Sequence, residues 1–180
     1  MIRLVHFQES DFDQLIEWIY DEEILIKWCG SLFKFPLTRE SLSWYIKSTN
    51  IVGESEAFVY KAIDEEDNIV GHISLGGLSY KNKSARVTRV LVGNNAQRGK
   101  GCCQSMIKEV LKVAFDELKL HRVSLGVYND NEPALKCYQK TGFVIEGINR
   151  DVLWYKEKWW SLMEMSILEN EWHALHPANV

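Results

Sequence analysis

The 180-residue sequence has no excess of positive charge: 21 Lys and Arg residues stand against 25 Asp and Glu residues, giving a formal net charge of −4. Proteins that bind nucleic acid through its phosphates need clustered Lys and Arg. We therefore expect no nucleic-acid partner. No apolar run approaches about 18 residues, the length at which a run becomes a candidate transmembrane helix. We therefore also expect no membrane partner.

Cysteine is scarce, and its four positions form no motif of a metal or redox site. No two of them form a C-x-x-C pair, and no nearby His completes the spacing of zinc ligands. Residues 1–4 lead straight into a strand-like pattern, so we expect no signal peptide. The simplest interpretation is a cytoplasmic protein with reduced thiols. The cysteines are Cys29, Cys102, Cys103 and Cys137.

The composition is that of a globular chain, with 46% hydrophobic and 26% charged residues. No internal repeat, low-complexity segment or linker divides it, so we expect one domain over residues 1–180. Alternating apolar residues predict strands at 2–7, 57–63, 69–78, 85–92, 121–127, 143–148 and 159–168. Helical spacing predicts two helices, which begin after Ser10 and at Thr38, and two more at 103–118 and 131–140.

The order of these segments predicts the fold class. The strand at 85–92, the helix at 103–118 and the strand at 121–127 form a βαβ unit, which implies parallel pairing. The remaining strands follow one another as an antiparallel run and a final hairpin. The sequence therefore predicts an α+β (mixed α/β) domain with a mixed central sheet flanked by helices.

The segment at 92–103, VGNNAQRGKGCC, joins a predicted strand to a predicted helix. A helix N-terminus presents free backbone N–H groups, which bind anions. Gly99 and Gly101 would let the backbone approach a ligand closely, and Arg98 and Lys100 add positive charge. A phosphate site and a plain glycine-rich turn both fit this loop. A P-loop fits poorly, because five residues rather than four separate Gly93 from Gly99 and no Ser or Thr follows Lys100.

Two sequence patterns favour the phosphate site. Residues 98–103 fit [Q/R]-x-x-G-x-[G/A] except at the last position, where Cys103 replaces Gly or Ala. The pattern N-x-x-A-x-x-x-Y-x-x-x-G-F is matched in full by Asn131, Ala134, Tyr138, Gly142 and Phe143. With both patterns in this order, nearly the whole chain resembles the GNAT family of acetyl-CoA-dependent N-acetyltransferases. Its terminal segments resemble the RimJ/RimL-like subgroup, which acetylates the N-termini of ribosomal proteins and related amines.

The resemblance implies that the cofactor is acetyl-CoA and that no metal is needed. The pantetheine arm would run along the backbone of Val90, Leu91 and Val92, where an N–H would polarise the thioester carbonyl. Asn131 would bind the cofactor or fix the local loop, and Cys103 is small enough to be tolerated. The pyrophosphate would lie on the backbone of Arg98, Gly99, Lys100, Gly101, Cys102 and Cys103.

The resemblance also assigns Tyr138 as the catalytic residue, a general acid that protonates the leaving thiolate. Without it, Tyr138 would be interpreted as a core tyrosine. An amine acceptor must lose a proton before it attacks, because an alkyl ammonium has a pKa near about 10. Many relatives supply a Glu as the base, but Thr88 aligns with that position here. His72, Glu146 or a chain of water molecules are the alternatives, and the sequence does not decide between them.

Two groups of side chains have competing interpretations. Asp21, Glu22 and Glu23 could attract a cationic acceptor or could form a solvated helix face. The aromatic cluster of Trp154, Tyr155, Trp159 and Trp160 could line the acceptor site, form the interface of a homodimer, or simply pack together.

The sequence thus predicts an enzyme, an N-acetyltransferase that moves an acetyl group from acetyl-CoA to a primary amine. The acceptor would be a peptide N-terminus, a polyamine or another small amine that attacks directly. Two alternatives remain at this point. The first is a non-catalytic module that binds acyl-CoA, because Thr88 replaces the usual Glu. The second is a nucleotide-binding protein with a modified P-loop.

Overall fold

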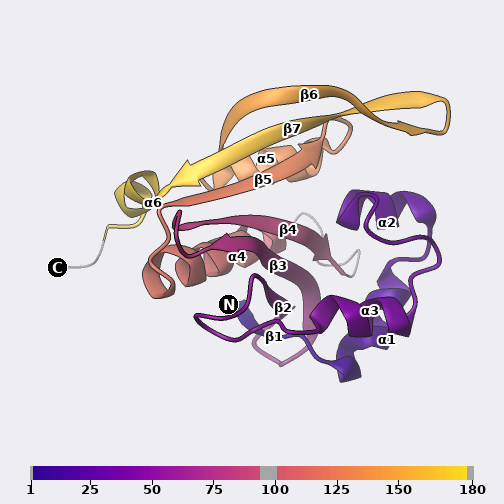
Figure 1. Cartoon of the computed structure of the whole chain (residues 1–180), viewed down its shortest axis with the longest axis horizontal. Coiled ribbons are helices and arrows are strands. Elements are labelled where there is room, and N and C mark those ends of the chain that lie inside the picture. Colours follow the sequence, from indigo (N-terminus) through magenta and orange to yellow (C-terminus); the bar gives the residue numbers. More distant parts are fainter. Residues whose placement is uncertain (1, 94–100, 178–180) are drawn as a thin grey trace.

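The computed structural model describes residues 2–93 and 101–177 of the chain. Seven strands form one sheet in the spatial order β1-β2-β3-β4-β5-β7-β6 (Figure 1). Within the described residues, β4 and β5 pair in parallel, and each other neighbouring pair is antiparallel. The strands are β1 (Arg3–His6), β2 (Phe58–Ile63), β3 (Ile69–Ser79), β4 (Ser84–Val92), β5 (Arg122–Tyr128), β6 (Val144–Tyr155) and β7 (Lys158–Leu168).

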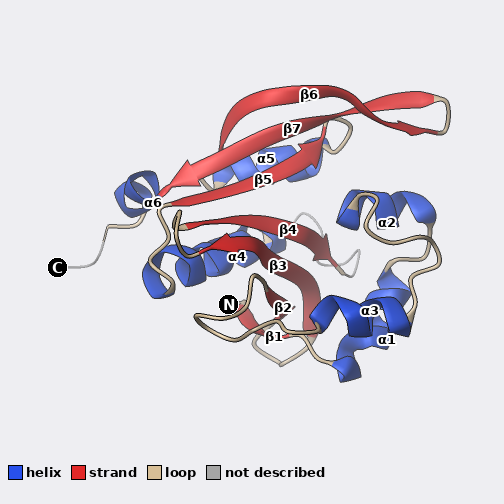
Figure 2. Ribbon diagram, viewed as in Figure 1, coloured by secondary structure: helices blue, strands red, loops and turns tan. Residues whose placement is uncertain are grey.

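Helices flank this sheet and close its ends (Figure 2). The helices are η1 (Glu9–Asp11), α1 (Phe12–Trp18), α2 (Glu22–Cys29), α3 (Arg39–Ile46), α4 (Cys102–Lys112), η3 (Val113–Glu117), α5 (Glu132–Lys140) and α6 (Glu169–Leu175). Of these, η1 is a 3-10 turn and η3 is a π-helical extension of α4. No helix among the described residues is long and apolar enough to cross a membrane.

Two apolar cores lie on opposite faces of the sheet. Successive residues of a strand point to opposite faces, and in β2 Phe58 and Tyr60 join one core while Val59 joins the other. The first core contains the buried residues of α4, α5 and α6, and the second contains those of α1, α2 and α3. The sheet is therefore covered by a different set of helices on each face.

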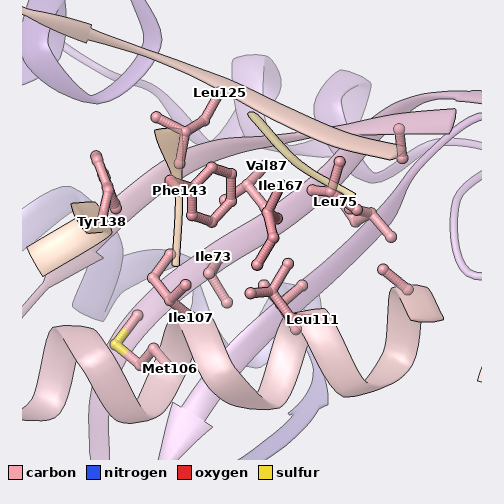
Figure 3. Packing of buried hydrophobic residues seen from close by; sticks show 14 of the residues in the cluster. Ile73, Leu75, Val87, Met106, Ile107, Leu111, Leu125, Tyr138, Phe143 and Ile167 are labelled. Atoms are coloured by element: carbon pink, nitrogen blue, oxygen red, sulfur yellow. The ribbon is translucent and has the colours of Figure 1, made fainter. Parts of the chain in front are cut away.

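Helix α4 forms because its apolar residues recur at helical spacing. Met106, Ile107, Val110 and Leu111 are fully buried against the sheet, and Figure 3 shows Met106, Ile107 and Leu111 pointing from the helix into the core. The sequence predicted this helix and the parallel strands on either side of it. Both are confirmed, as is the mixed α/β fold class.

Strands β4 and β5 pair over a short distance and then separate. Their register joins Ser84–Arg86 to residues 122–124 and ends there. A bulge in β4 follows, since Thr88 pairs with Ser74 whereas Leu91 pairs with His72, which leaves two residues of β4 opposite one of β3. The remainder of β4 is thus paired with β3 alone, and its other edge is open.

Some elements differ from the prediction. Helix α2 was not predicted, although Asp21 accepts a hydrogen bond from the Ile24 N–H as its N-cap and Gly30 ends it at a φ of 61°. Helix α6 was not predicted either. Strand β6 continues to Tyr155 rather than ending at residue 148, which makes the last hairpin much longer than expected. The assignment of one domain to residues 1–180 remains a prediction.

Candidate active site

A groove of about 1120 Å³ opens where β4 and β5 separate. Its walls come from α2, the open edge of β4, the last residues of β5, the start of α4, and α5. Figure 1 shows β4 and β5 diverging, with α2 near the side on which they are farthest apart. The separation of two parallel strands thus creates an elongated site in the middle of the sheet.

One end of the groove is the N-terminus of α4. Gly101 precedes the helix at a φ of 80°, a left-handed conformation that favours glycine. The first backbone hydrogen bond of the helix runs from the Ser105 N–H to the Gly101 carbonyl. The N–H groups of Cys102, Cys103 and Gln104 therefore have no acceptor within the helix. These three residues line the groove. The predicted phosphate-binding residues Arg98, Gly99 and Lys100 lie outside the described residues.

Two lysines of α5 add positive charge to the groove, Lys136 and Lys140. Together with the free N–H groups of α4, they fit the pyrophosphate of coenzyme A, which is a dianion. The open edge of β4 fits an extended pantetheine arm. The residues present therefore match the cofactor that the sequence predicted.

The open edge of β4 has a defined pattern of backbone groups. The Gly93 N–H donates to the Val70 carbonyl at 2.9 Å. In an antiparallel pair, alternate residues direct their backbone groups toward the partner strand. Those of Leu91 therefore face β3, and those of Val90 and Val92 face the groove. All three residues line the groove, as predicted for backbone partners of the cofactor, but two of them present free groups to it.

Tyr138 lies on α5 and lines the same groove. Its ring packs on Phe143 with centroids 6.2 Å apart, and Figure 3 shows Tyr138 at one side of the core and Phe143 within it. No described residue makes a hydrogen bond to its hydroxyl group. Burial raises the pKa of Tyr138 well above its ordinary value, so the phenol keeps its proton at neutral pH.

Asn131 is the N-cap of α5, the helix that carries Tyr138. Its side chain caps α5 by accepting a hydrogen bond from the Ala134 N–H at 3.4 Å, and Pro133 occupies the first turn. The capping bond supports the second predicted role of Asn131, which is to fix the loop. Gly142 ends the motif at a φ of 100°.

The cysteines differ from the prediction. Cys103 in the first turn of α4 and Cys137 of α5 form a disulfide with a Cα–Cα distance of 6.4 Å. The expectation that all four thiols are reduced is therefore wrong in this structure. The two residues are 34 positions apart, so no short motif reveals that the fold places α4 beside α5. Cys29 and Cys102 are free.

Neither side chain proposed as the general base lines the groove. His72 is buried beneath it, and its Nε2 lies 3.2 Å from the hydroxyl of Tyr45. Burial, with a smaller contribution from the Arg89 charge, lowers the pKa of His72 to about 3. A group with this pKa is a weak base at neutral pH.

Glu146 lies on β6, where Arg122 donates two hydrogen bonds to it at 2.7 and 2.6 Å. These bonds, with a further bond from Ser166, lower its pKa to about 2. Thr88 does line the groove, but its hydroxyl shares a 2.8 Å hydrogen bond with Ser74 and no carboxylate takes its place. Of the alternatives in the sequence analysis, a chain of water molecules fits the geometry best.

The acidic residues at the α2 end of the groove already have hydrogen-bond or ion-pair partners. Asp21 caps α2, and Glu23 pairs with Lys27 at 3.0 Å and with Lys156 at 3.3 Å. Lys27 pairs in addition with Asp130 at 2.8 Å. Glu22 does not line the groove. The ion pair of Lys156 with Glu23 links the turn of the β6–β7 hairpin to α2.

The predicted aromatic cluster is divided between two settings. Trp160 is buried, packs on Tyr128 and Tyr155, and has the Lys27 ammonium 5.2 Å from its ring centroid. Trp154 and Trp159 instead pack on each other and are more than half exposed. Trp160 therefore supports the wall of the groove, whereas the other two tryptophans form part of the hairpin surface.

Arg89 is a groove residue that the sequence pattern did not reveal. It lies in the bulge of β4 at a φ of 53°, and the Trp28 Nε1–H donates to its carbonyl at 3.0 Å. In the sequence, Arg89 stands out only as a charged residue within the strand-like run RVTRVLV, residues 86–92. The bulge is a shift in the pairing of β4 with β3, so the sequence of β4 alone does not predict it.

Free N–H groups at a helix start, an open strand edge and a protonated phenol are groups that suit acyl transfer from a CoA thioester. Residues 2–144 match the family model described as "Acetyltransferase (GNAT) domain". The chain therefore belongs to the GNAT acetyltransferase family. It is an enzyme that uses acetyl-CoA and transfers the acetyl group to an amine.

Individual relatives agree with this assignment. The chain is 29% identical over 123 residues to the uncharacterized N-acetyltransferase YokL from the SPbeta prophage of Bacillus subtilis, covering 68% of each chain. It is 27% identical over 109 residues to spermidine N(1)-acetyltransferase of Vibrio cholerae, covering 61% of this chain and 62% of that one. The alignment therefore spans less than two thirds of the Vibrio relative.

A solved structure confirms the fold. Spermidine N-acetyltransferase from Vibrio cholerae, in complex with CoA and spermine, superposes with a TM-score of 0.81. The superposition covers 95% of this chain and 97% of that one, at 21% sequence identity. At this level of identity the likeness concerns the fold, and the acceptor has to be argued from the groove.

Proposed function

We propose that this enzyme acetylates a small primary amine in the groove between β4 and β5, with Tyr138 as the general acid. The observation that carries the proposal is the convergence of three features on one groove. These are the N-terminus of α4, the open backbone edge at Val90 and Val92, and the unbonded hydroxyl of Tyr138. The relative named for spermidine acetylation favours a small amine over a protein substrate.

Each residue has a defined task in this proposal. Acetyl-CoA supplies the acetyl thioester, from which the amine displaces the thiol. The free N–H group of Val90 donates a hydrogen bond to the carbonyl oxygen as negative charge develops on it, and the free backbone groups of Val92 face the pantetheine arm. The Tyr138 hydroxyl donates its proton to the departing sulfur, and its raised pKa ensures that it holds that proton. One proton of the ammonium group leaves through water in the groove before the attack, and a second leaves the nitrogen as the amide forms and restores the Tyr138 phenol.

The remaining assignments are part of the same proposal. Cys102, Cys103 and Gly101 bind the pyrophosphate through their backbone, together with residues 98–100. The chain lies in the RimJ/RimL-like subgroup on the basis of its terminal segments, and it is a cytoplasmic enzyme. A homodimer formed through the exposed tryptophans of β6–β7 is expected as well, and light scattering in solution tests it.

The test is the release of CoA thiol in the presence of a panel of amines, for the wild type and for Tyr138→Phe. General acid catalysis contributes about 10²–10⁴-fold, so kcat should fall by at least about 100-fold while the KM for acetyl-CoA changes little. Tyr60→Phe is the matched control, because Tyr60 is also buried with a raised pKa but lies outside the groove lining. An unchanged rate in Tyr138→Phe, with intact CoA binding, would disprove the acid role.

A further inference from the structure

Arg89 lies on the acceptor side of the groove rather than on the cofactor side. Its guanidinium carbon is 4.7 Å from the centroid of the Tyr45 ring on α3, and its backbone carbonyl accepts from Trp28 of α2. Tyr45 and Trp28 belong to the core that covers the sheet face opposite α4. The cofactor's phosphates, in contrast, are expected at the N-terminus of α4.

The hydrogen-bonding capacity of Arg89 is largely unused. A guanidinium has five N–H donors. One Nη1 bond reaches the Thr88 hydroxyl at 3.1 Å, whereas Nε is buried without any partner. Among residues 2–93 and 101–177, no carboxylate lies within 4.0 Å of the side chain. A partly buried guanidinium without an anion is unfavourable, so this site is prepared for an anionic partner.

The other charges at this end of the groove do not share this property. Lys27 already pairs with Glu23 and Asp130, and Arg86 makes a two-bond pair with Glu164 at 2.7 and 3.0 Å. Among the described residues at this end of the groove, Arg89 is therefore the cation without a carboxylate partner, while the Glu23 carboxylate of α2 is already paired.

We propose that Arg89 binds a carboxylate of the acceptor, so that the acceptor is a free amino acid. The inference rests on the proposed function and specifies its substrate class. A planar guanidinium fork matches a carboxylate through two parallel hydrogen bonds. Arg89 adjoins Val90, whose backbone faces the reacting carbonyl, and both residues line the groove. A small molecule that carries both an amine and a carboxylate can therefore present the carboxylate to Arg89 and the amine to the thioester.

The test compares acceptors that differ in the carboxylate alone. The panel contains methionine, phenylalanine and leucine, the amide of each, and spermidine, all measured by thiol release. The wild type should use the acids with a kcat/KM at least about 10-fold above that of the amides, because the amides lack the carboxylate that forms a hydrogen-bonded ion pair with Arg89. Arg89→Met should lower kcat/KM for the acids by about 10- to 100-fold and leave that of the amides nearly unchanged.

Two further variants complete the design. Arg89→Lys keeps the charge but not the fork and should retain part of the preference for acids. Arg122→Met removes an arginine that pairs with Glu146 outside the groove lining and should behave as the wild type. CoA affinity, measured by calorimetry, should be the same in all variants. That result also shows that Arg89→Met is folded.

The possible outcomes separate this inference from the proposed function. Equal or better use of amides or spermidine by the wild type would overturn the role of Arg89 and leave acetyl transfer to a small amine intact. Weakened CoA binding in Arg89→Met, with an unchanged preference for acids, would assign Arg89 to the cofactor and overturn the inference as well. Tight CoA binding without turnover of any amine would overturn the proposed function itself.

Discussion

Acidification from pH 7.5 to 5.5 should weaken the fold through one buried histidine, His72. Its ring is enclosed by Phe7, Trp28 and Tyr45, with ring centroids 4.6 to 5.8 Å away. Arg89 adds a positive charge nearby, and Nδ1 is buried without a hydrogen-bond partner. Burial and this charge together lower the pKa of His72 to about 3. The folded protein therefore keeps the ring neutral.

The sign of the effect follows from proton linkage. In the unfolded chain the pKa is near about 6.5, so below that pH the unfolded state binds a proton that the folded state excludes. The contribution to stability is fully present above pH 6.5 and is lost as the pH falls toward 3. Between pH 7.5 and 5.5, protonation of the histidine favours the unfolded state by about a factor of ten, which lowers the free energy of unfolding by about 1.4 kcal/mol.

Urea unfolding at a series of pH values measures this effect. With an m value of about 2 kcal/mol/M, the urea midpoint should fall by about 0.7 M between pH 7.5 and 5.5. His72→Phe keeps an aromatic ring in the cage and should abolish the shift, and His72→Gln serves if that variant does not fold. His173→Gln, which removes an exposed histidine, should retain it. The reasoning fails if the wild-type midpoint does not move, or if the His72 variants move as much as the wild type.

Three further predictions follow from packing and from the cofactor loop. Gly142→Ala should lower the free energy of unfolding by about 1–3 kcal/mol, because Gly142 has a φ of 100° and an added Cβ would lie 2.9 Å from Cδ1 of the buried Ile167; thermal unfolding would show it as a fall of roughly 2–10 °C, and an unchanged midpoint would contradict it. Met106→Ala removes a fully buried side chain and should cost about 2–5 kcal/mol, measured by urea unfolding; a loss below about 1 kcal/mol would contradict its place in the core. Cys103→Ala should bind CoA about as well as wild type and Cys103→Leu should bind it worse in calorimetry. Both variants lose the disulfide, so their comparison isolates bulk at the loop, and equal binding would mean that the motif is misaligned.

The features that the sequence predicted correctly are local or have a regular period. Helix α4 has a repeating apolar face, and the strands on either side of it have their own alternation, so the βαβ unit could be predicted without knowing any tertiary contact. The resemblance singled out Asn131, Tyr138 and Gly142 in one short helix and its ends; the structure shows the cap at Asn131 and the positive φ at Gly142, and the catalytic role of Tyr138 stays a prediction.

The features that the sequence missed depend on contacts between distant segments. The disulfide joins Cys103 to Cys137 only because α4 and α5 lie side by side in the fold. Arg89 enters the groove through a bulge that exists in the pairing of β4 with β3. His72 resembled an ordinary strand histidine, and its unusual environment comes from three separate segments that meet over one face of the sheet.

A crystal structure with bound CoA would test the central claim most directly, by the position of its thiol. The account predicts that the pyrophosphate lies on the N–H groups at the start of α4 and that the pantetheine arm follows Val90 and Val92. The sulfur should then lie within hydrogen-bonding reach of the Tyr138 hydroxyl, roughly 3–4 Å from it. A thiol on the far side of β4, or out of reach of Tyr138 with the phosphates correctly placed, would contradict the account.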